Sequence, residues 1–176
     1  MLNISLVYGG IAGVIIIAAM IVGYAVSGGE GFGSSQAVGF LFMFIALSLI
    51  FIGVKKYRDQ EMGGVIKFGK ALLVGLSISL VAAIAYIISW EIYLAVTDYA
   101  FAEQYVEMVI AQWEAKGISG AELAEKTEML NRSMANYDNP FYRIPITFTE
   151  IFPVALVISL VSAAILRNPK VLPARG

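Results

Sequence analysis

The sequence predicts an all-α polytopic membrane protein with four transmembrane helices and an extracytoplasmic helical hairpin between the third and fourth helices. Three observations predict this class: the share of apolar residues, the length of the charge-free runs, and the uneven distribution of Lys and Arg. Of the 176 residues, 59% are hydrophobic and 14% are charged, and the mean hydropathy is +0.80. Soluble domains carry about 25% charged residues, so we expect this chain to lie in a bilayer.

Long charge-free runs set the number of crossings. Residues 1–29, 31–54, 71–90 and 151–166 contain no charged side chain. A helix needs about 20 apolar residues to cross the hydrocarbon core, and the last run reaches this length when residues 144–150 are included. Continuous runs also exclude the alternating pattern of a membrane barrel. We expect one membrane domain over residues 1–176, with helical spans at about 4–27, 36–55, 70–97 and 144–166.

The first apolar run is interpreted as a retained helix. A secretory signal peptide is the alternative, because the small residues of Ala25–Ser27 resemble a cleavage site. However, no Lys or Arg precedes the run, and the run is longer than the hydrophobic region of a signal peptide. The sequence therefore favours a membrane-spanning helix here.

Basic residues predict the orientation. Segments 55–70 and 167–176 hold eight of the twelve Lys and Arg residues, and four crossings place both segments on the same side. Segment 98–143 instead holds eight of the thirteen acidic residues. The positive-inside rule then puts both termini in the cytoplasm and segment 98–143 outside, in a multi-pass protein. Binding of anionic lipid is the alternative role for the basic loop, and the sequence favours the topological role.

Segment 98–143 is expected to form the two arms of a hairpin. The first arm should continue the third span without a break and end at Lys116–Gly117, where Gly suits a left-handed cap. Ser119 and Glu122 have the spacing of a capping box that opens the second arm. Apolar residues recur at helical spacing on both arms. They are Ala102, Tyr105, Val106, Val109 and Trp113 on the first arm, and Leu123, Leu130, Met134 and Tyr137 on the second.

These two apolar stripes are expected to pack on each other or on a second copy of the chain. The alternative is a lid, or a surface that docks a partner, above the membrane bundle. Asn139–Pro140 should end the second arm, and Pro145 suits the first turn of the fourth span.

Two carboxylates lie inside the expected spans. Glu91 precedes Thr97 by six residues and Glu150 follows Ile144 by six, so both should lie about 9 Å below the outer surface. An ionisable group at that depth needs a partner, and Arg143 is the nearest basic residue. The candidate intramembrane polar site comprises Glu91, Glu150, Arg143, Thr147 and Tyr86.

Three interpretations of this site compete. It is a structural polar clamp, a site for a cation or proton, or an acid/base pair of an enzyme. The chain has no Cys and no His, which excludes disulfides, His-based triads, Cys nucleophiles, and metal sites built from those residues. No catalytic residue, metal site or cofactor is predicted, so we do not expect an enzyme.

Small residues recur at every fourth position on three spans, a pattern that lets helix backbones approach closely. For the third and fourth spans we expect contact within one chain, whereas the stripe on the first span leaves open a contact within the chain or a dimer. The stripes are Gly9 and Gly13, then Ala19 and Gly23, on the first span, Gly75, Ser79 and Ala83 on the third, and Ala155, Ser159 and Ala163 on the fourth.

Aromatic residues flank the expected spans and suit anchoring at the membrane interfaces. On the outer side these residues are Tyr99, Phe101, Tyr105, Phe141 and Tyr142.

The stretch Phe51–Asp59 (Phe-Ile-Gly-Val-Lys-Lys-Tyr-Arg-Asp), followed by Met62–Lys70 and Gly75, resembles the central signature of a bacterial membrane family, domain of unknown function 4199. Segments Thr149–Pro153 and Ser159–Arg167 extend the resemblance to the last span. The resemblance implies a four-helix protein with a helical insertion before the last helix, placed in a bacterial cytoplasmic (inner) membrane. It carries over no activity and no site residue.

The predicted function is that of a non-enzymatic integral membrane protein that acts by self-association or by association with another membrane component. The expected partners are the lipid bilayer and, through the 98–143 hairpin, a homo-oligomer or a membrane protein. Nucleic acid is not expected, because the net charge of −1 leaves no basic excess. The alternative is a small cation or proton conduit or carrier that uses Glu91 and Glu150.

Overall fold

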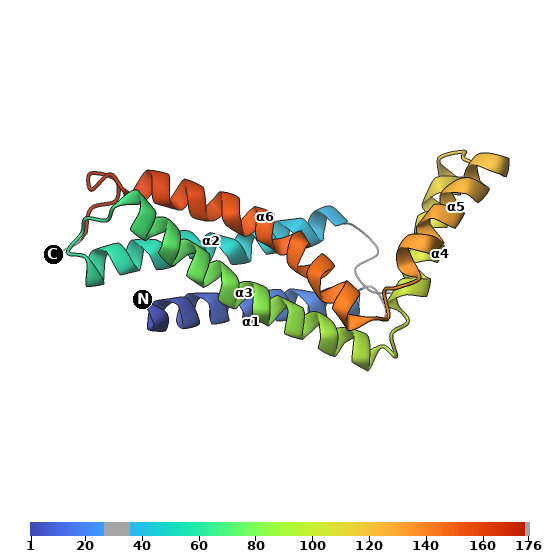
Figure 1. Cartoon of the computed structure of the whole chain (residues 1–176), viewed down its shortest axis with the longest axis horizontal. Coiled ribbons are helices and arrows are strands. Elements are labelled where there is room, and N and C mark those ends of the chain that lie inside the picture. Colours follow the sequence, from blue (N-terminus) through green and yellow to red (C-terminus); the bar gives the residue numbers. More distant parts are fainter. Residues whose placement is uncertain (27–35, 175–176) are drawn as a thin grey trace.

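The computed structural model describes residues 1–26 and 36–174, and these residues form helices and short connections with no strand (Figure 1). The all-helical class expected from the sequence is thus confirmed. The helices of the described residues are α1 (Leu2–Val26), α2 (Gln36–Glu61), α3 (Phe68–Val96), α4 (Phe101–Ala115), α5 (Gly120–Met134) and α6 (Pro140–Leu166).

Three helices of the described residues are long and apolar enough to cross a membrane. They contribute the stretches Leu2–Ala19 in α1, Phe68–Val96 in α3 and Pro140–Leu166 in α6. Helix α2 is 26 residues long and ends in the basic segment that contains Lys55 and Arg58, and it is not one of these three. The chain therefore has the helices of a membrane protein.

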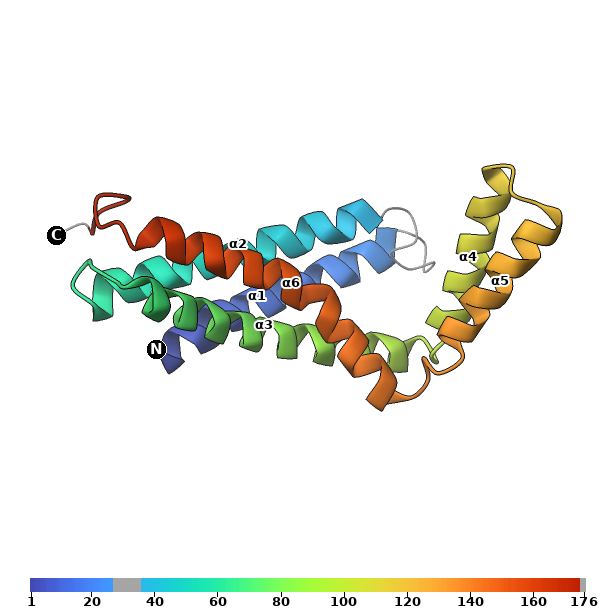
Figure 2. The same ribbon diagram turned by 45° about the horizontal axis from the view of Figure 1, so that its top comes forward.

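Helices α1, α2, α3 and α6 lie side by side along the long axis of the molecule (Figure 1). Helices α2 and α3 each contact the other three members of this bundle. Helices α4 and α5 form a hairpin that leaves one end of the bundle at an angle, while both chain termini lie at the opposite end (Figure 2). We call these two ends of the molecule the hairpin end and the basic end.

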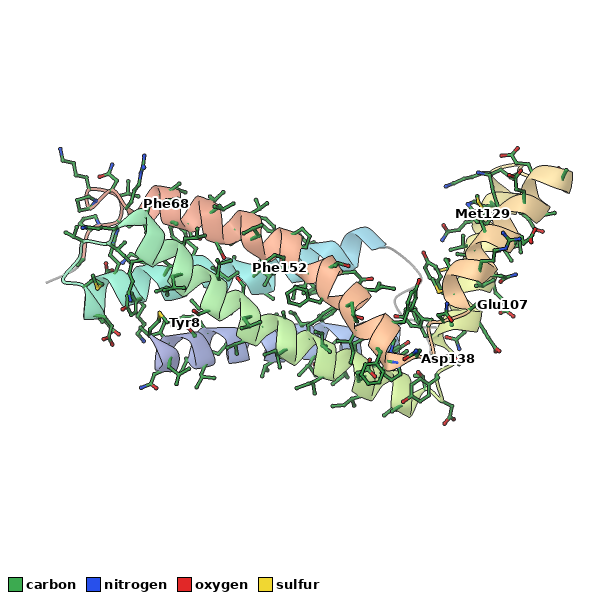
Figure 3. All side chains as sticks on the ribbon, in the orientation of Figure 1. Tyr8, Phe68, Glu107, Met129, Asp138 and Phe152 are labelled. Carbon is green, nitrogen blue, oxygen red and sulfur yellow. The ribbon has the colours of Figure 1, made fainter. Side chains whose placement is uncertain are left out.

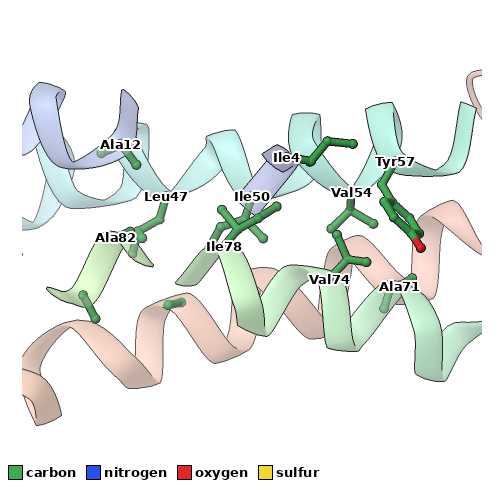
Figure 4. Packing of buried hydrophobic residues seen from close by; sticks show 14 of the residues in the cluster. Ile4, Ala12, Leu47, Ile50, Val54, Tyr57, Ala71, Val74, Ile78 and Ala82 are labelled. Atoms are coloured by element: carbon green, nitrogen blue, oxygen red, sulfur yellow. The ribbon is translucent and has the colours of Figure 1, made fainter. Parts of the chain in front are cut away.

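The core of the bundle is apolar and is formed by all four helices (Figure 4). Ile50, Val74 and Ile78 are among its fully buried members. The outside of the bundle is apolar as well. Helix α3 exposes Leu80, Ile84, Ile88 and Ile92, one turn apart along a single face. An outward stripe of this kind is unfavourable in water and suits contact with lipid.

Small residues bring the helix backbones together, as the spacing predicted for α3 and α6. A Cβ atom added to Gly75 would lie 3.0 Å from the Cβ and Oγ atoms of Ser159, and the hydroxyl oxygens of Ser79 and Ser159 are 3.1 Å apart. The stripe on α1 also packs inside the chain. A Cβ atom on Gly9 would lie 2.8 Å from the carbonyl oxygen of Ile78, and one on Gly13 would overlap the side chain of Ala85.

The expectation that one helix continues from the third span into the hairpin is wrong. Helix α3 ends at Val96, and Asp98 and Tyr99 have φ angles of 51° and 58°. The backbone N–H of Tyr99 donates to the carbonyl of Leu94 over 2.8 Å, the bond that closes a helix whose next residue is left-handed. Gly usually occupies such a position, and most other L-residues pay about 1–2 kcal/mol there. Asp98 belongs to a residue type that adopts this conformation more readily than most, but neither a Gly nor a Pro marks the break in the sequence.

The first arm ends as predicted, but the second arm opens differently. Gly117 has φ 83°, and the N–H of Ile118 donates to the carbonyl of Trp113 over 3.0 Å. Ser119 stands at the N-cap of α5, yet its side chain makes no capping hydrogen bond. The capping box expected from Ser119 and Glu122 is therefore not formed.

Helix α6 begins four residues earlier than the expected fourth span. Asn139 caps it, with its side-chain oxygen accepting a hydrogen bond of 3.0 Å from the N–H of Phe141. Pro140 is the first helical residue, a position where the missing N–H is harmless. Pro145 consequently lies inside α6, together with Pro153, and not in the first turn as expected.

The close approach of α1 and α3 predicts that substitution of two adjacent glycines by alanine has different effects on stability. Gly9→Ala would drive a methyl group into the backbone of Ile78 and the side chain of Val81, which lies 2.6 Å from the added atom. Overpacking of this kind lowers stability by about 1–3 kcal/mol. We expect Gly9→Ala to lower the thermal unfolding temperature in mild detergent.

Gly10→Ala is the matched control, because an added Cβ at Gly10 meets no atom within 4 Å. Equal unfolding temperatures for the two variants would contradict the packing of α1 on α3.

Candidate functional site

A buried ion pair joins α3 to the start of α6 at the hairpin end. The side chain of Arg143 is 1% exposed and that of Glu91 is 28% exposed. The Nε atom of Arg143 donates to Oε1 of Glu91 over 2.8 Å, and Nη2 donates to Oε2 over 2.6 Å. Two parallel bonds between a guanidinium and a carboxylate are stronger and more directional than a single contact. The pair therefore fixes the angle between the ends of the two helices.

The same guanidinium also binds the chain that enters α6. Its Nη1 atom donates to the carbonyl of Tyr137 over 2.7 Å. The central carbon lies 5.5 Å from the ring centroid of Tyr99 and 5.7 Å from that of Tyr137, within the range of attraction between a cation and an aromatic ring. Arg143 thus connects α3, the break after α3 and the segment before α6.

Aromatic rings complete this junction between the bundle and the hairpin. The indole N–H of Trp90 donates to the hydroxyl of Tyr137 over 2.9 Å. The ring of Phe101, the first residue of α4, lies 4.8 Å from that of Trp90 and 5.6 Å from that of Tyr137. Burial of Tyr137 outweighs the hydrogen bond from Trp90 and raises the pKa of this tyrosine to about 12. Its hydroxyl therefore keeps its proton at neutral pH.

The junction divides the aromatic residues for which an interfacial position was expected. Phe101 and Tyr105 stack on each other with their ring centroids 5.7 Å apart, so they belong to the packing of the hairpin. Phe141 is 91% exposed and Tyr142 is also exposed. Anchoring at the membrane interface stays a prediction, and Phe141 and Tyr142 have the surface for it.

The second candidate carboxylate has a different environment. Glu150 is exposed, and its Oε2 atom accepts a hydrogen bond of 3.4 Å from the hydroxyl of Tyr86 on α3. Thr147 is buried, and its hydroxyl donates to the carbonyl of Arg143 in its own helix over 3.1 Å. The structure thus brings Glu91 to Arg143 and Tyr86 to Glu150, and it gives the two carboxylates separate partners.

The basic end contains a second buried arginine, which was not among the predicted site residues. Arg58 at the end of α2 is fully buried. Its Nη1 atom donates to the carbonyl of Val171 over 2.9 Å and to that of Leu166 over 3.5 Å, and its Nη2 atom donates to the carbonyl of Leu172. Arg58 therefore holds the end of α6 and the tail that follows it.

Asp59 completes this second cluster. It accepts hydrogen bonds from the side chains of Arg58 and Lys55. Partial burial acts to raise the pKa of Asp59, but the two cationic donors outweigh burial and hold this pKa below its ordinary value. The sequence contained one signal for this cluster. Asp59 follows Lys55 by four residues within the basic stretch 55–59, a spacing that favours an ion pair on a helix.

Neither cluster has the composition of a metal centre. Within residues 1–26 and 36–174, no three His, Cys, Asp or Glu side chains come close enough together to hold a metal ion. Each buried side-chain nitrogen or oxygen of these residues has a hydrogen-bond partner.

The fold and the two clusters define a helical protein with helices of membrane-spanning length. A buried arginine fixes the packing at each end of the bundle, Arg143 at the hairpin end and Arg58 at the basic end. A family model described as "Protein of unknown function (DUF4199)" matches residues 7–168. The chain therefore belongs to this family, as the signature around Phe51–Asp59 predicted. No curated protein and no solved structure matches the chain.

The ion pair at the hairpin end predicts a difference between the two carboxylates. Glu91→Gln leaves the buried charge of Arg143 without its counter-charge. Breaking a fully buried pair lowers stability by about 3–5 kcal/mol, and because the Glu91 side chain is 28% exposed, water reduces the loss below that range. Glu150→Gln removes an exposed group and is the matched control. We expect a clearly lower unfolding temperature in detergent for Glu91→Gln and little change for Glu150→Gln.

The double variant Glu91→Leu with Arg143→Met should recover most of the loss, because an apolar pair leaves no buried charge unpaired. A Glu91→Gln protein as stable as wild type would contradict the interpretation of the Arg143–Glu91 pair as a structural clamp.

Proposed function

We propose that this chain is a four-span membrane protein that acts by association through its hairpin and does not catalyse a reaction. The observation that carries this proposal is the position of the hairpin. Helices α4 and α5 pack on each other, bury none of their residues fully, and project away from the bundle (Figure 2). Two ordered helices that add nothing to the bundle core suit contact with another molecule.

Support for a fourth crossing comes from α2. It runs beside the three apolar helices and contacts each of them, and residues 31–54 are free of charge. Four crossings put both termini and the loop between α2 and α3 on one side, and these segments do gather at the basic end (Figure 1). The excess of Lys and Arg there supports a cytoplasmic basic end and an exterior hairpin.

This orientation predicts a labelling pattern that the absence of native cysteine makes simple to read. Glu125 on α5 and Gln60 on α2 are both exposed. In intact cells, a Cys at position 125 should react with a membrane-impermeant thiol reagent, whereas a Cys at position 60 should react only after permeabilisation. The reverse pattern would place the hairpin inside and remove the basis for an exterior partner.

The exposed surface of the hairpin is acidic. Lys126 and Arg132 are already paired with acidic residues one turn away, Glu122 and Glu128. Figure 3 labels Glu107 on the hairpin and Asp138 at its base, and both residues are exposed. The exposed glutamates of α4 and α5 are Glu103, Glu107, Glu114, Glu122, Glu125 and Glu128.

This charge pattern selects the kind of partner. Two such hairpins would repel each other, since like charges at close range are unfavourable. A membrane component with a basic exterior surface is therefore favoured over a hairpin-to-hairpin dimer, and self-association would have to use the membrane-facing sides of the bundle. The expected apolar stripes do not offer a contact surface, because Val109, Trp113 and Leu130 are half-buried within the hairpin.

A cation or proton conduit that uses both Glu91 and Glu150 is the second candidate function. The geometry supports it less, because both oxygens of Glu91 are engaged by Arg143 and the two carboxylates have separate partners.

Association through the hairpin predicts a partner that is lost on charge reversal. In mild detergent at low salt, the wild-type protein should co-purify with a membrane component. The variant Glu103→Lys, Glu107→Lys, Glu114→Lys should lose it, because the attraction becomes repulsion. Raised salt should weaken the wild-type complex, since it screens exposed charges.

The variant Gln104→Ala, Gln112→Ala is the control, because it changes exposed residues of the same helix without changing charge. A monomeric wild-type particle without a partner, or a charge-reversed protein that keeps its partner, would contradict the proposal.

A further inference from the structure

The two carboxylates of the membrane helices differ in what surrounds them. Glu91 forms an ion pair with a buried arginine, whereas Glu150 is exposed on the side of α6. The buried stripe of α6 follows every fourth residue and includes Thr147, Ile151 and Ala155. This row is inclined to the helix axis. Glu150 stands one position before Ile151, about 100° around the helix, so it lies at the edge of the stripe and outside the core.

Glu150 is well inside the span. Ten residues separate it from Pro140 and sixteen from Leu166, which corresponds to about 15 Å and about 24 Å along the helix. Helix α6 is about 40 Å long, and the hydrocarbon core is about 30 Å thick, so a centred core would begin about 10 Å before Glu150. The carboxyl group therefore lies at a depth where lipid is the solvent.

The surface around Glu150 is the lipid-facing surface of the bundle. Residues seven and eleven positions later return to the same face of a helix, and these are Val157 and Val161, both more than half exposed. Pro153, on the turn after Glu150, is exposed as well. Where α6 crosses a bilayer, a carboxyl group on this face would meet acyl chains.

Among the described residues, no cationic side chain is paired with Glu150. Arg143 directs its donors to Glu91 and Tyr137, and α6 has no other basic residue within its bounds. The groups that face Glu150 are the hydroxyl of Tyr86 on α3 and, further away, that of Tyr137. Helix α2, the other neighbour of α6, has no ionisable side chain in residues 36–54.

The single hydroxyl of Tyr86 is not enough to stabilise an ionised carboxylate at Glu150 or to complete the ligands of a metal ion there. An ionised group in hydrocarbon is costly, and a group in that position takes up a proton instead. Metal cations such as Ca²⁺ and Mg²⁺ need about six oxygen ligands. In the part of the chain that the structure describes, Tyr86 supplies the one side-chain hydrogen bond to Glu150, and Thr149 donates to the carbonyl of Ile146 in its own helix.

We propose that Glu150 is a proton-binding site on the membrane-facing side of α6, where the apolar surroundings hold it as a neutral carboxylic acid and the hydroxyl of Tyr86 orients its carboxyl group. Tyr86 donates to Oε2, which leaves the acid O–H free to donate to a lipid ester or to a neighbouring protein. The site binds and releases one proton, and release leaves a carboxylate that must reach water. This inference does not depend on the association proposed for the hairpin.

The experiment uses the full-length protein in phospholipid vesicles at neutral pH, treated with dicyclohexylcarbodiimide. This apolar reagent adds to a protonated carboxyl group. The carboxyl oxygen bonds to the central carbon, the acid proton moves to nitrogen, and rearrangement to an N-acylurea retains every atom. Peptide mass spectrometry should find the adduct on Glu150 and none on Glu91. Labelling should decrease as the pH is raised, because the carboxylate form does not react.

Two variants distinguish loss of the proton-binding site from a general change in the fold. Glu150→Gln should abolish the adduct, while Glu91→Gln should keep it on Glu150. An independent measurement is the infrared carbonyl band of a protonated carboxyl group, which should be present in wild type and in Glu91→Gln and absent from Glu150→Gln. The proposal is overturned if Glu150 remains unlabelled, if labelling is confined to exterior residues such as Glu107, or if the wild-type protein lacks the carbonyl band.

Discussion

The relation between the bundle and the hairpin depends on one interaction, the pair formed by Arg143 and Glu91. A guanidinium withdrawn from water must satisfy its donors within the protein, and Arg143 does so with a carboxylate on α3 and a carbonyl just before α6. The rings of Tyr99 and Tyr137 lie against it. Because these partners come from three segments, the directions of α3, of the break after it and of α6 are set together, and the hairpin takes its position from them.

The opposite end of α6 is also fixed by a buried arginine, but here the arginine lies on another helix and α6 supplies a hydrogen-bond acceptor. There the arginine lies on α2 and the carbonyls belong to the end of α6 and the following tail. The last carbonyls of a helix have no partner within the helix, and Arg58 supplies donors to one of them and to two beyond it. Helix α6 is therefore held at both ends by a buried cation, while its middle is held by close contact with α3 at Gly75 and Ser159.

Between the two ends of the bundle, polar and apolar side chains are distributed differently over the interior and the outer sides of the helices. The interior is apolar, and each buried polar side-chain atom of the described residues has a partner. The outer sides of α3 and α6 are also apolar, as expected where lipid and not water is the solvent. Acidic groups gather instead on the hairpin, beyond the spans. Glu150 is the exception, a carboxyl group on an apolar side, and this is why its protonation state is informative about the protein.

The sequence by itself determined the helical class, the three apolar spans, the small-residue contacts of α3 and α6, and the left-handed end of α4 at Gly117. Each of these is encoded by residues near one another in the chain, through their apolarity, size or backbone preference. Only the tertiary structure decided that α3 breaks at Asp98 and Tyr99, that Arg143 binds Glu91 and leaves Glu150 to Tyr86, and that Arg58 is buried. The pairings of these residues join positions 52 to 114 apart in the chain. A backbone conformation or a buried charge that is locally unfavourable is retained because such distant partners stabilise it.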